Sequence, residues 1–595
     1  MPIEFIIFPP SMAAPRNMIC KSEETHMKNE ITKLLKKGVI VKCPPEEGEI
    51  ISPVFLRPKS DGTYRLILNL KKANEYVQNF HFKMDTIHTV LNLVKPNCFM
   101  ASIDIKDAYY SIKIAEQHQK YLKFKFQGQC YKFSCLPNGL CVGPRKFTKL
   151  MKAPLAELRK MGHLVSSFID DLINFGDSYE ECIQNVVDTI MILQKLGFTI
   201  HPEKSHLIPT QEIKFLGFII NSKTMKVKLT EEKMTSILEE CQNALHSTSL
   251  KIRDVAKIIG KIIATFPAVK YGPLHFRFIE SCKSKAVKMN KGNYNAPMYL
   301  DKSSKENLSW WINNIRSAYN DIYIDTPTAT LYTDASNLGW GAVYKSRTTK
   351  GSWNEGERSM HINALELKAI LFGLKSLVKD ERIHLQVLCD NTSAVHILNK
   401  MGSSHTEVCD TLVREIWFFA ISKNIWLSAS HIPGKQNVDA DRESREHDLQ
   451  TEWKLSASIF HEIVVYFGRK PDIDLFASRI NYQINPFVSY RPDPDAFAVD
   501  AFQLNWKNYF FYAFPPFCII GRILQKVLIE EAEGILIVPN WPNQPWYSRL
   551  TRMFKTKPLC ISRRKQMLHL PNKPEEQHPL HNSLELLACH IGGKS

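Results

Sequence analysis

The stretch HLVSSFIDDLINFGDS, residues 163–178, places two adjacent aspartates, Asp170 and Asp171, inside an otherwise apolar run. The flanking Val, Phe, Ile and Leu residues predict two short strands of a buried sheet, with the acids at or near the bend. Burying carboxylates among apolar side chains is costly unless a positive charge meets them. The stretch therefore raises the question of which positive group lies beside the two aspartates.

A second acid lies on a predicted strand upstream. CFMASIDIKDAYYSIKI, residues 98–114, alternates apolar and polar residues around Asp104 and indicates a strand of a buried sheet. Hard cations such as Mg²⁺ prefer carboxylate oxygens, and nucleotide polymerisation uses two such ions ~3.5–4 Å apart. An isolated pair of aspartates is more often a solvated turn, but the apolar strands and the third acid favour a two-metal site.

The neighbouring segments predict the local framework of this sheet. Residues 52–70 read as a hairpin around a KSDGT turn, and residues 24–38 read as a helix that ends at Gly38. Residues 143–158 read as a helix interrupted by Pro154. A further helix follows Ser178, which forms a capping box with Glu181. Its expected apolar stripe is Ile183, Val186, Val187 and Ile190, and its expected end is Gly197.

Length and composition indicate a large, basic globular protein. The chain has 595 residues, enough for roughly four domains. Its 77 basic and 60 acidic residues give a net charge of +17, which by itself fits a partner such as nucleic acid and a merely basic soluble protein equally well. The 14 cysteines form no C-x-x-C pair, which favours reduced intracellular thiols over a zinc or disulfide framework. No convincing signal peptide or membrane span is found, so we expect a cytoplasmic or nuclear location and no secretion.

Six ordered stretches between about residues 51 and 220 resemble the fingers and palm of reverse transcriptases. The stretches are SPVFLRPKSDGTYRLILNL, SIDIKDAYYSI, LPNGLCVGPRKFTKLM, FIDD, LGFTIHPEKS and FLGFII. The resemblance implies that Asp104, Asp170 and Asp171 hold two Mg²⁺ or Mn²⁺ ions. Two departures from the family pattern are mild: Phe168 stands where Tyr is commoner, and Asn138 stands where Gln or an aromatic residue is frequent.

The same resemblance implies roles for residues that bind the nucleotide. Arg65, and less surely Lys59, would neutralise the triphosphate, although each could be an ordinary surface charge. Tyr109 would exclude a ribose 2′-hydroxyl, unless it is a plain core aromatic. The turn at Asn138 and Gly139 would lie against template and nucleotide, and Lys204 would lie near the leaving phosphate. FLGF would be the hairpin that grips the primer end.

A second set of acids recurs further along the chain. Each of these acids alone would be read as an ordinary surface residue, but their predicted strand–helix–strand–helix order is typical of a second two-metal site. They are Asp334 in LYTDASNLGWGAV, Glu366 in NALELKAI, Asp390 in VLCDNTSAV and Asp441 in NVDADRES. Residues 328–444 resemble ribonuclease H, which implies that these four residues bind two divalent ions. His431 matches a mobile histidine that assists product release, and Asp439 fits the fourth metal position less well than Asp441.

The final segment resembles the region that follows ribonuclease H in DIRS-like retrotransposons, on PDIDLFASRINYQINPFVSYRPDPDAFAVDAFQLNW, YAFPPF and GILIVPNWPNQPW. Such elements use a tyrosine recombinase from another reading frame, and neither that enzyme nor an aspartic protease motif is found here. FPPF also stands where Dam-type adenine methyltransferases carry Asn/Asp-Pro-Pro-Tyr/Phe. Because Phe514 cannot accept a hydrogen bond from an amine, we favour a degenerate or structural domain, in which Phe517 could still stack on a base.

Together these resemblances imply an α+β multidomain enzyme: a right-hand polymerase, a ribonuclease H-like domain and a small α/β C-terminal domain. It would copy RNA into DNA and degrade the RNA of the hybrid. The partners would be an RNA template, a DNA primer, an RNA–DNA hybrid and dNTPs, with an element-encoded recombinase and capsid protein as further candidates. The alternatives are an LTR-type or pararetroviral enzyme, and an inactive relic that only binds nucleic acid.

The expected domain ranges are an N-terminal arm at 1–45, fingers and palm at 46–225, a basic helical thumb and connection at 226–325, ribonuclease H at 326–448 and the C-terminal domain at 449–595.

Overall fold

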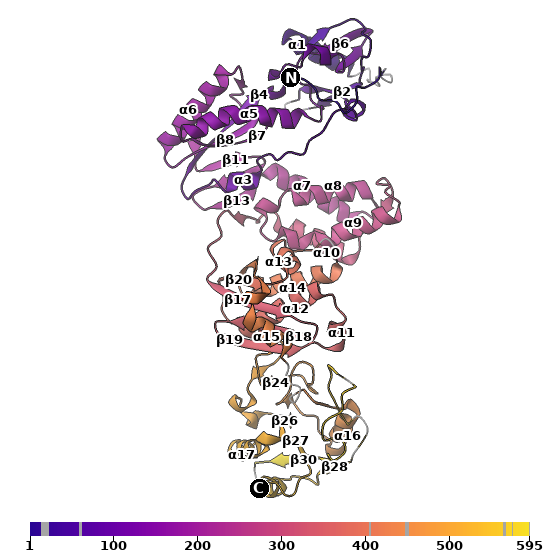
Figure 1. The fold of residues 1–595 in the computed structure, drawn as a ribbon, viewed down its shortest axis with the longest axis vertical. Helices are drawn as coiled ribbons and strands as arrows, with labels where there is room; N and C mark the ends of the chain where they lie inside the picture. Colours follow the sequence, from indigo (N-terminus) through magenta and orange to yellow (C-terminus); the bar gives the residue numbers. More distant parts are fainter. Residues whose placement is uncertain are drawn as a thin grey trace. The chain divides into compact units, whose positions relative to one another are not determined.

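The computed structural model describes all residues except 13–22, 59–61, 404–405, 447–451, 563, 565–566, 574 and 594–595. The chain forms two compact units, Met1–Gly272 with Lys283–Ile324 and Pro273–Cys282 with Asp325–Ser595. Both units combine helices with sheets (Figure 1), which confirms the expected α+β multidomain fold class. Within the described ranges, no helix is both long and apolar enough to cross a membrane.

The N-terminal sheet carries the first set of acids. Its strands are β4 (Phe99–Lys106), β7 (Leu164–Phe168), β8 (Asp171–Gly176) and β10 (His206–Thr210), with β9 (Thr199–Ile200) paired to β4. The order is β10-β4-β8-β7, and β8 is antiparallel to both of its neighbours, β4 and β7. Two helices, α5 (Gly143–Lys160) and α6 (Tyr179–Lys195), bury their apolar residues in the same core as β4 and β8. The predicted strand–bend–strand around the aspartates is confirmed.

Helix α6 begins where the sequence predicts but buries a different face. The Ser178 hydroxyl accepts a hydrogen bond from the Glu181 N–H at 3.1 Å, and the chain turns at Gly197 with φ +82°. The predicted apolar stripe is partly wrong, because Ile183 and Val187 are 37% and 43% exposed. Polar residues take their places in the core: the Asn174 amide of β8 donates to Asn185 at 2.8 Å and to Thr189 at 2.7 Å.

The rest of the first unit forms further sheets and helices. The hairpin β2–β3 precedes the acid-bearing sheet in the chain, a three-stranded sheet combines β1 with β5 and β6 from between β4 and β7, and a four-stranded sheet and a group of helices follow. Pro154 lies inside α5 rather than ending it. The elements are α1 (Glu24–Lys36), β1 (Ile40–Lys42), β2 (Val54–Pro58), β3 (Tyr64–Leu68), α2 (Lys71–Asn74), α3 (Ile87–Leu91), η1 (Ala108–Ser111), α4 (Glu116–Gln119), β5 (Lys123–Phe126), β6 (Gln129–Phe133), β11 (Glu212–Phe215), β12 (Phe218–Asn221), β13 (Lys226–Leu229), α7 (Glu231–His246), β14 (Leu250–Lys251), α8 (Ile252–Ile263), η2 (Phe266–Ala268), η3 (Gly272–His275), α9 (Arg277–Met289), β15 (Pro297–Met298), α10 (Lys302–Asn314) and β16 (Asn320–Asp321), of which η3 and α9 cross between the two units.

The middle domain, residues 325–446, is built on a mixed five-stranded sheet. Its order is β19-β18-β17-β20-β21: β17, β18 and β19 are antiparallel, and β20 and β21 run parallel to β17. Helix α12 is buried along most of its length because it packs against β17 and β18. The elements are β17 (Ala329–Ala335), β18 (Gly339–Tyr344), β19 (Arg347–Ser352), α11 (Glu355–Arg358), α12 (Ile362–Leu377), β20 (His384–Cys389), α13 (Thr392–Asn399), α14 (Glu407–Ser422), β21 (Trp426–His431), η4 (Gly434–Gln436) and α15 (Val438–Arg445).

The C-terminal domain, residues 452–593, has its own five-stranded sheet in the order β23-β26-β27-β30-β28. The strands β23, β26 and β27 are parallel, and β30 is antiparallel to both of its neighbours. The elements are β22 (Lys454–Leu455), α16 (Ala457–Phe467), β23 (Ile473–Asp474), β24 (Val488–Ser489), β25 (Ala498–Val499), η6 (Ala501–Gln503), η7 (Trp506–Asn508), β26 (Phe510–Ala513), η8 (Phe517–Ile519), α17 (Ile520–Glu530), β27 (Glu533–Pro539), α18 (Tyr547–Arg552), β28 (Leu559–Ile561), β29 (Leu568–His569) and β30 (Leu586–Gly592).

A buried ion pair joins the C-terminal domain to the middle domain within the second unit. Arg479 donates from both terminal nitrogens to the two carboxylate oxygens of Glu357, and one of these bonds is 3.0 Å long. Both side chains are at most 7% exposed. Arg479 also donates to the Ser352 carbonyl at 2.9 Å and lies 4.6 Å over the ring of Phe372 on α12. Lys368 of α12 binds the same glutamate at 2.7 Å, so the pair is tied to that helix.

Candidate active sites

The register of the N-terminal sheet places Asp104 directly opposite Asp171. Asp104 is the sixth residue of β4, Asp171 is the first residue of β8, and their Cα atoms are partners in the antiparallel ladder. Asp170 lies in the two-residue turn between Phe168 and Asp171, and its carbonyl accepts a hydrogen bond from the Ile105 N–H at 2.9 Å. The three predicted acids therefore lie at one end of one strand pair.

The turn that holds Asp170 is strained. Ile169 has φ +57°, a left-handed conformation that costs a β-branched residue about 1–3 kcal/mol and is found mostly at functional sites. Burial, together with the charges of Asp170 and Asp104, raises the pKa of Asp171 to about 6. Burial and the Asp170 charge also raise the pKa of Asp104. Burial and mutual repulsion thus disfavour the ionised forms of Asp104 and Asp171, and a bound cation would offset this effect.

Lys204 is the basic side chain that lies near these acids. Its charge lowers the pKa of both Asp104 and Asp171, although the lysine itself is exposed. Two residues that sequence reasoning missed fix the backbone here: the Ser205 hydroxyl accepts from the Asp104 N–H at 3.0 Å and donates to the His201 carbonyl at 2.8 Å. Both lie within the stretch LGFTIHPEKS, which was the available signal.

Tyr109 lies in η1, directly after β4. Its half-buried ring meets Phe147 of α5 edge-to-face at a centroid distance of 5.7 Å. Burial and the Asp170 charge raise the pKa of the phenol to about 12, so the hydroxyl lies within electrostatic range of the acids. The structure therefore places Tyr109 beside the predicted site rather than in a separate core.

The Asn138–Gly139 turn is built against the strand that carries Arg65. Gly139 has φ +108°, and a Cβ there would lie 2.8 Å from the Leu68 carbonyl oxygen of β3, so only glycine fits without a shift of the backbone. Asn74, which sequence reasoning missed, donates to the Gly139 carbonyl at 2.9 Å. Asn138 donates to the Tyr110 hydroxyl at 3.3 Å.

Of the two residues predicted to bind the triphosphate, the structure describes Arg65 but not Lys59. Arg65 is exposed on β3, and its charge lowers the pKa of Tyr110. Arg65 therefore lies near Tyr110, whose hydroxyl Asn138 contacts. Lys59 lies outside the described residues. The predicted FLGF hairpin is formed by β11 and β12, where the Lys233 ammonium group donates to the Leu216 carbonyl at 2.9 Å.

The middle sheet gathers the second set of acids at the ends of its central strands. Asp334 lies on β17, Asp390 directly follows β20, and Glu366 projects from α12. Burial, together with the charges of Asp334 and Asp390, raises the pKa of Glu366 to about 9. Asp334 is 4% exposed, and burial with the charges of Asp390 and Asp441 raises its pKa.

Helix α15 brings Asp441 to this site. The helix packs so closely on β18 that a Cβ at Gly341 would lie 2.4 Å from the Ala440 carbonyl oxygen. Asp441 itself pairs with Arg445 at 2.6 Å. The charge of Asp441 raises the pKa of Asp334. Asp439 instead pairs with Arg442 at 3.2 Å on the exposed side of the helix.

Several further residues complete this region. Ser444, missed by sequence reasoning, donates to the Asp334 carboxylate at 2.6 Å, and Asn437 donates to the Thr333 carbonyl at 2.9 Å. His431 is exposed at the end of β21, where its Cα is the partner of Cys389 in the parallel ladder.

The two acid sets differ in how tightly they converge. Among the residues that the structure describes, one group of potential metal ligands has an atom from each of three side chains within 4.8 Å of one another: Glu366, Cys389 and Asp390. The three aspartates of the N-terminal sheet do not meet that distance. Carboxylates of like charge repel one another, and the charge of Lys204 partly offsets this repulsion there.

The FPPF stretch of the C-terminal domain borders a very small cavity. Phe514, Tyr512 and Asp474 are among its lining residues, and its volume is ≈ 10 Å³. Burial raises the pKa of Asp474 to about 7. One Asp474 oxygen and the Tyr512 hydroxyl have no hydrogen-bond partner among the described residues. Phe517 is packed edge-to-face on Trp541 with ring centroids 5.4 Å apart. A cavity of this size has room for about one water molecule.

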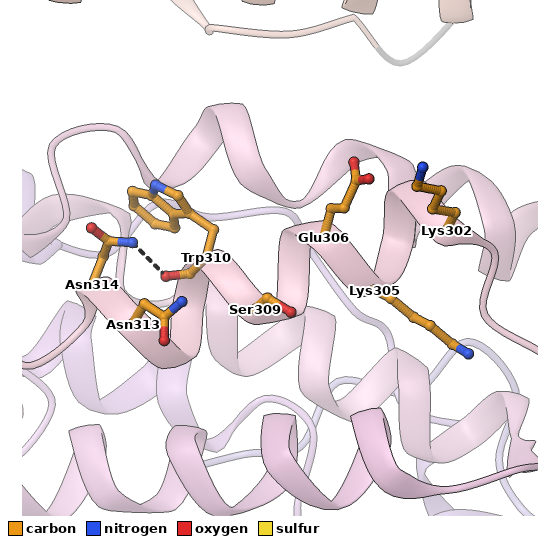
Figure 2. Close-up of a pocket in the computed structure, with 7 residues that line it drawn as sticks. All are labelled: Lys302, Lys305, Glu306, Ser309, Trp310, Asn313 and Asn314. Carbon is orange, nitrogen blue, oxygen red and sulfur yellow. Dashed lines mark hydrogen bonds between the residues drawn. The ribbon is translucent and has the colours of Figure 1, made fainter.

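An open groove lies along helix α10 of the first unit. Its volume is ≈ 660 Å³, and Figure 2 shows that the residues that line it all come from one helix. They are Lys302, Lys305, Glu306, Ser309, Trp310, Asn313 and Asn314.

Known proteins are similar to parts of this chain. A family model described as reverse transcriptase (RNA-dependent DNA polymerase) matches residues 57–220. The enzymatic polyprotein of Figwort mosaic virus (strain DxS) is 24% identical over 441 residues, which cover 70% of this chain and 61% of that polyprotein. The transposon Tf2-3 polyprotein of Schizosaccharomyces pombe is 26% identical over 199 residues, 33% of this chain and 14% of the relative. The chain therefore spans less than two thirds of these relatives. A solved foamy viral protease–reverse transcriptase in complex with RNA/DNA hybrid has a TM-score of 0.47 and 17% identity, covering 76% of this chain and 59% of that chain.

Proposed function

We propose that this chain, which has a reverse transcriptase domain at residues 57–220 and homologues among viral and transposon polyproteins, is an RNA-directed DNA polymerase with ribonuclease H activity. The observation that carries the first activity is the register that sets Asp104 against Asp171 with Asp170 in the strained turn between them. Buried acids with raised pKa values at the edge of a sheet are typical of sites that bind cations.

The metal that fits both acid sets is Mg²⁺ or Mn²⁺, because the donors are mainly carboxylate oxygens that lack sufficient positive partners. Asp104, Asp170 and Asp171 would hold two ions at the first site, and Asp334, Glu366, Asp390 and Asp441 would hold two at the second. When bound, such a pair activates the attacking oxygen and stabilises the charge that develops on the phosphate.

The other residues of the first site bind and orient the nucleotide. Arg65 offers a charged side chain on the surface of β3, beside the Asn138–Gly139 turn, where it can meet the triphosphate. Lys204 lies close enough to the acids to neutralise the leaving phosphate. Tyr109, directly after the strand of Asp104, limits space near the sugar and so selects a dNTP. The same reasoning assigns the primer end to the β11–β12 hairpin.

The second site would cleave the RNA strand of the hybrid that polymerisation leaves. Asp334, Glu366 and Asp390 come from three consecutive elements of the middle sheet, and Asp441 is held near them by the close packing of α15. His431, exposed on the neighbouring strand, would assist product release. Its exposure supports a mobile side chain.

Helix α10 would track the duplex by its phosphates. Lys302 and Lys305 are exposed on the open groove, and Trp310 and Asn313 continue the same face (Figure 2). Contacts of this kind position a nucleic acid without reading its sequence. The RNA template, the DNA primer and their hybrid would all use this face.

The motifs of the C-terminal domain support a DIRS-like element, which implies a tyrosine recombinase encoded in another reading frame. We further propose that this domain is structural rather than a methyltransferase. Phe514 replaces the polar residue that would bind an amine, and the cavity beside it has no room for a base. Sequencing the DNA that flanks the gene tests the element type: an integrase frame instead of a recombinase frame would overturn it.

The test of the enzyme is primer extension on a 5′-labelled RNA template with dNTPs and Mg²⁺. Asp170→Asn should abolish extension and leave RNA cleavage, whereas Asp390→Asn should do the reverse. If the wild-type chain binds the hybrid and neither extends nor cuts it, the chain is a binding relic and the proposal is wrong.

A further inference from the structure

A cysteine adjoins the second acid site, and its thiol points at a catalytic-site carboxylate. Cys389 is fully buried at the end of β20, immediately before Asp390. Its sulfur donates to a Glu366 carboxylate oxygen at 3.5 Å. Atoms of Glu366, Cys389 and Asp390 lie within 4.8 Å of one another, so one ion could contact all three side chains.

The surroundings of this sulfur favour its thiolate when a cation is present. The Asn391 backbone N–H donates to the Cys389 sulfur at 3.3 Å, and a hydrogen bond of this kind stabilises negative charge on the acceptor. A bound divalent cation would be met by the sulfur as a thiolate, because a coordinating thiol loses its proton.

The donor set is mixed in a way that Mg²⁺ does not need. Mg²⁺ prefers oxygen donors, whereas Zn²⁺ and Cd²⁺ gain strongly from a thiolate ligand. One sulfur and two carboxylates, together with a solvent molecule, would give Zn²⁺ the four ligands it usually takes. In the described part of the N-terminal sheet, no cysteine belongs to such a cluster.

We propose that Glu366, Cys389 and Asp390 form a binding site for a soft divalent cation, Zn²⁺ or Cd²⁺, which competes with the Mg²⁺ of the ribonuclease site and switches RNA cleavage off while DNA synthesis continues. The regulatory part rests on the proposed ribonuclease function. Binding replaces the S–H bond of Cys389 with a sulfur–metal bond and releases the thiol proton to solvent, together with the carboxyl proton of Glu366 wherever that group is protonated. No oxidant or reductant takes part.

The first experiment measures binding alone. Cd²⁺ is titrated into the metal-free full chain while the ultraviolet thiolate-to-cadmium charge-transfer absorption is recorded, and the same titration is made with Cys389→Ser and Cys409→Ser. Cys409 is a buried cysteine of the same domain, on α14 and outside the cluster. The tightest component of the signal should be lost only in Cys389→Ser. An identical titration curve for all three proteins would overturn the site.

The second experiment measures regulation. Zn²⁺ is added at fixed Mg²⁺, and RNA cleavage and primer extension are each compared with the rate of the same protein without Zn²⁺. The half-inhibitory Zn²⁺ concentration for cleavage should rise at least tenfold in Cys389→Ser and stay unchanged in Cys409→Ser, whose folding and cleavage without Zn²⁺ are first compared with those of the wild type. Equal inhibition of wild type and Cys389→Ser would overturn the switch while leaving the ribonuclease proposal intact. A Cys389-dependent cadmium signal in a chain that never cuts RNA would uphold the site and refute the ribonuclease function instead.

Discussion

The buried carboxyl of Glu366 makes the metal-free protein less stable as pH rises. Its pKa increases from an ordinary 4.5 to about 9 on folding, because burial and two neighbouring acids oppose the ionised form. Between these two values the folded state keeps a proton that the unfolded state has lost. The free energy of unfolding therefore falls by up to about 1.4 kcal/mol per pH unit over this window.

Glu366→Gln removes this titration while it keeps the size of the side chain. Near pH 8 in EDTA the free energy of unfolding of the variant should exceed that of the wild type by about 2–5 kcal/mol. The upper limit of about 5 kcal/mol follows from the full pKa difference, and relaxation of the site lowers it. Near pH 5 the difference should shrink below about 1 kcal/mol. Excess Mg²⁺ should invert the order, because an ionised glutamate binds the cation better than an amide.

Hydrogen–deuterium exchange of the α12 amides in the full chain measures this difference locally, with both proteins compared at the same pH. Asp439→Asn, at an acid whose side chain is 63% exposed, is the matched control and should not alter the exchange. Equal protection of α12 in wild type and Glu366→Gln at both pH values would refute the claim that Glu366 is buried without a compensating charge.

Three further substitutions test other parts of the structure. Gly139→Ala should abolish primer extension and spare RNA cleavage, because the new Cβ would meet the backbone of β3. Gly128→Ala is the control: Gly128 has φ +82° and nothing within 4 Å of an added Cβ, so this variant suffers only the backbone strain of about 1 kcal/mol and should keep most extension. Tyr109→Ala should lower the preference for dNTP over rNTP at least tenfold in primer extension, and an unchanged preference would assign the ring to the core alone. Arg479→Ala should destabilise the second unit by about 3–5 kcal/mol in thermal unfolding, since it leaves the buried Glu357 carboxylate with less positive charge nearby. Arg491→Ala, at an exposed residue, should change the stability by less than about 0.5 kcal/mol. An equal effect of both substitutions would show that the ion pair is not buried in solution.

The sequence predicted the elements that carry the acids because their signals are local. Alternating strands, the cap at Ser178 and the turn at Gly38 each depend on a few adjacent residues, and all are found in the structure. The order of the motifs along the chain then predicted which acids should meet. The register that pairs Asp104 with Asp171 is consistent with that order.

Contacts between distant segments were not predictable in the same way. The buried face of α6 was partly wrong because Asn185 and Thr189 are satisfied by Asn174 of β8, and hydrophobic periodicity does not detect a polar network. Asn74, which holds the Gly139 turn, lies 65 residues away from it. The sequence predicts Cys389 only as an ordinary reduced thiol, since the packing of α12 on the middle sheet brings Glu366 against it.

The Arg479–Glu357 pair also constrains how such a chain can change by recombination. An exchange that replaced the C-terminal domain alone, with a segment lacking the arginine, would leave Glu357 buried with Lys368 as its remaining basic partner. The penalty of about 3–5 kcal/mol is a large part of the 5–15 kcal/mol by which a typical protein is stable. The two domains are therefore expected to be inherited as one block, with the arginine and the glutamate lost or retained together in related elements.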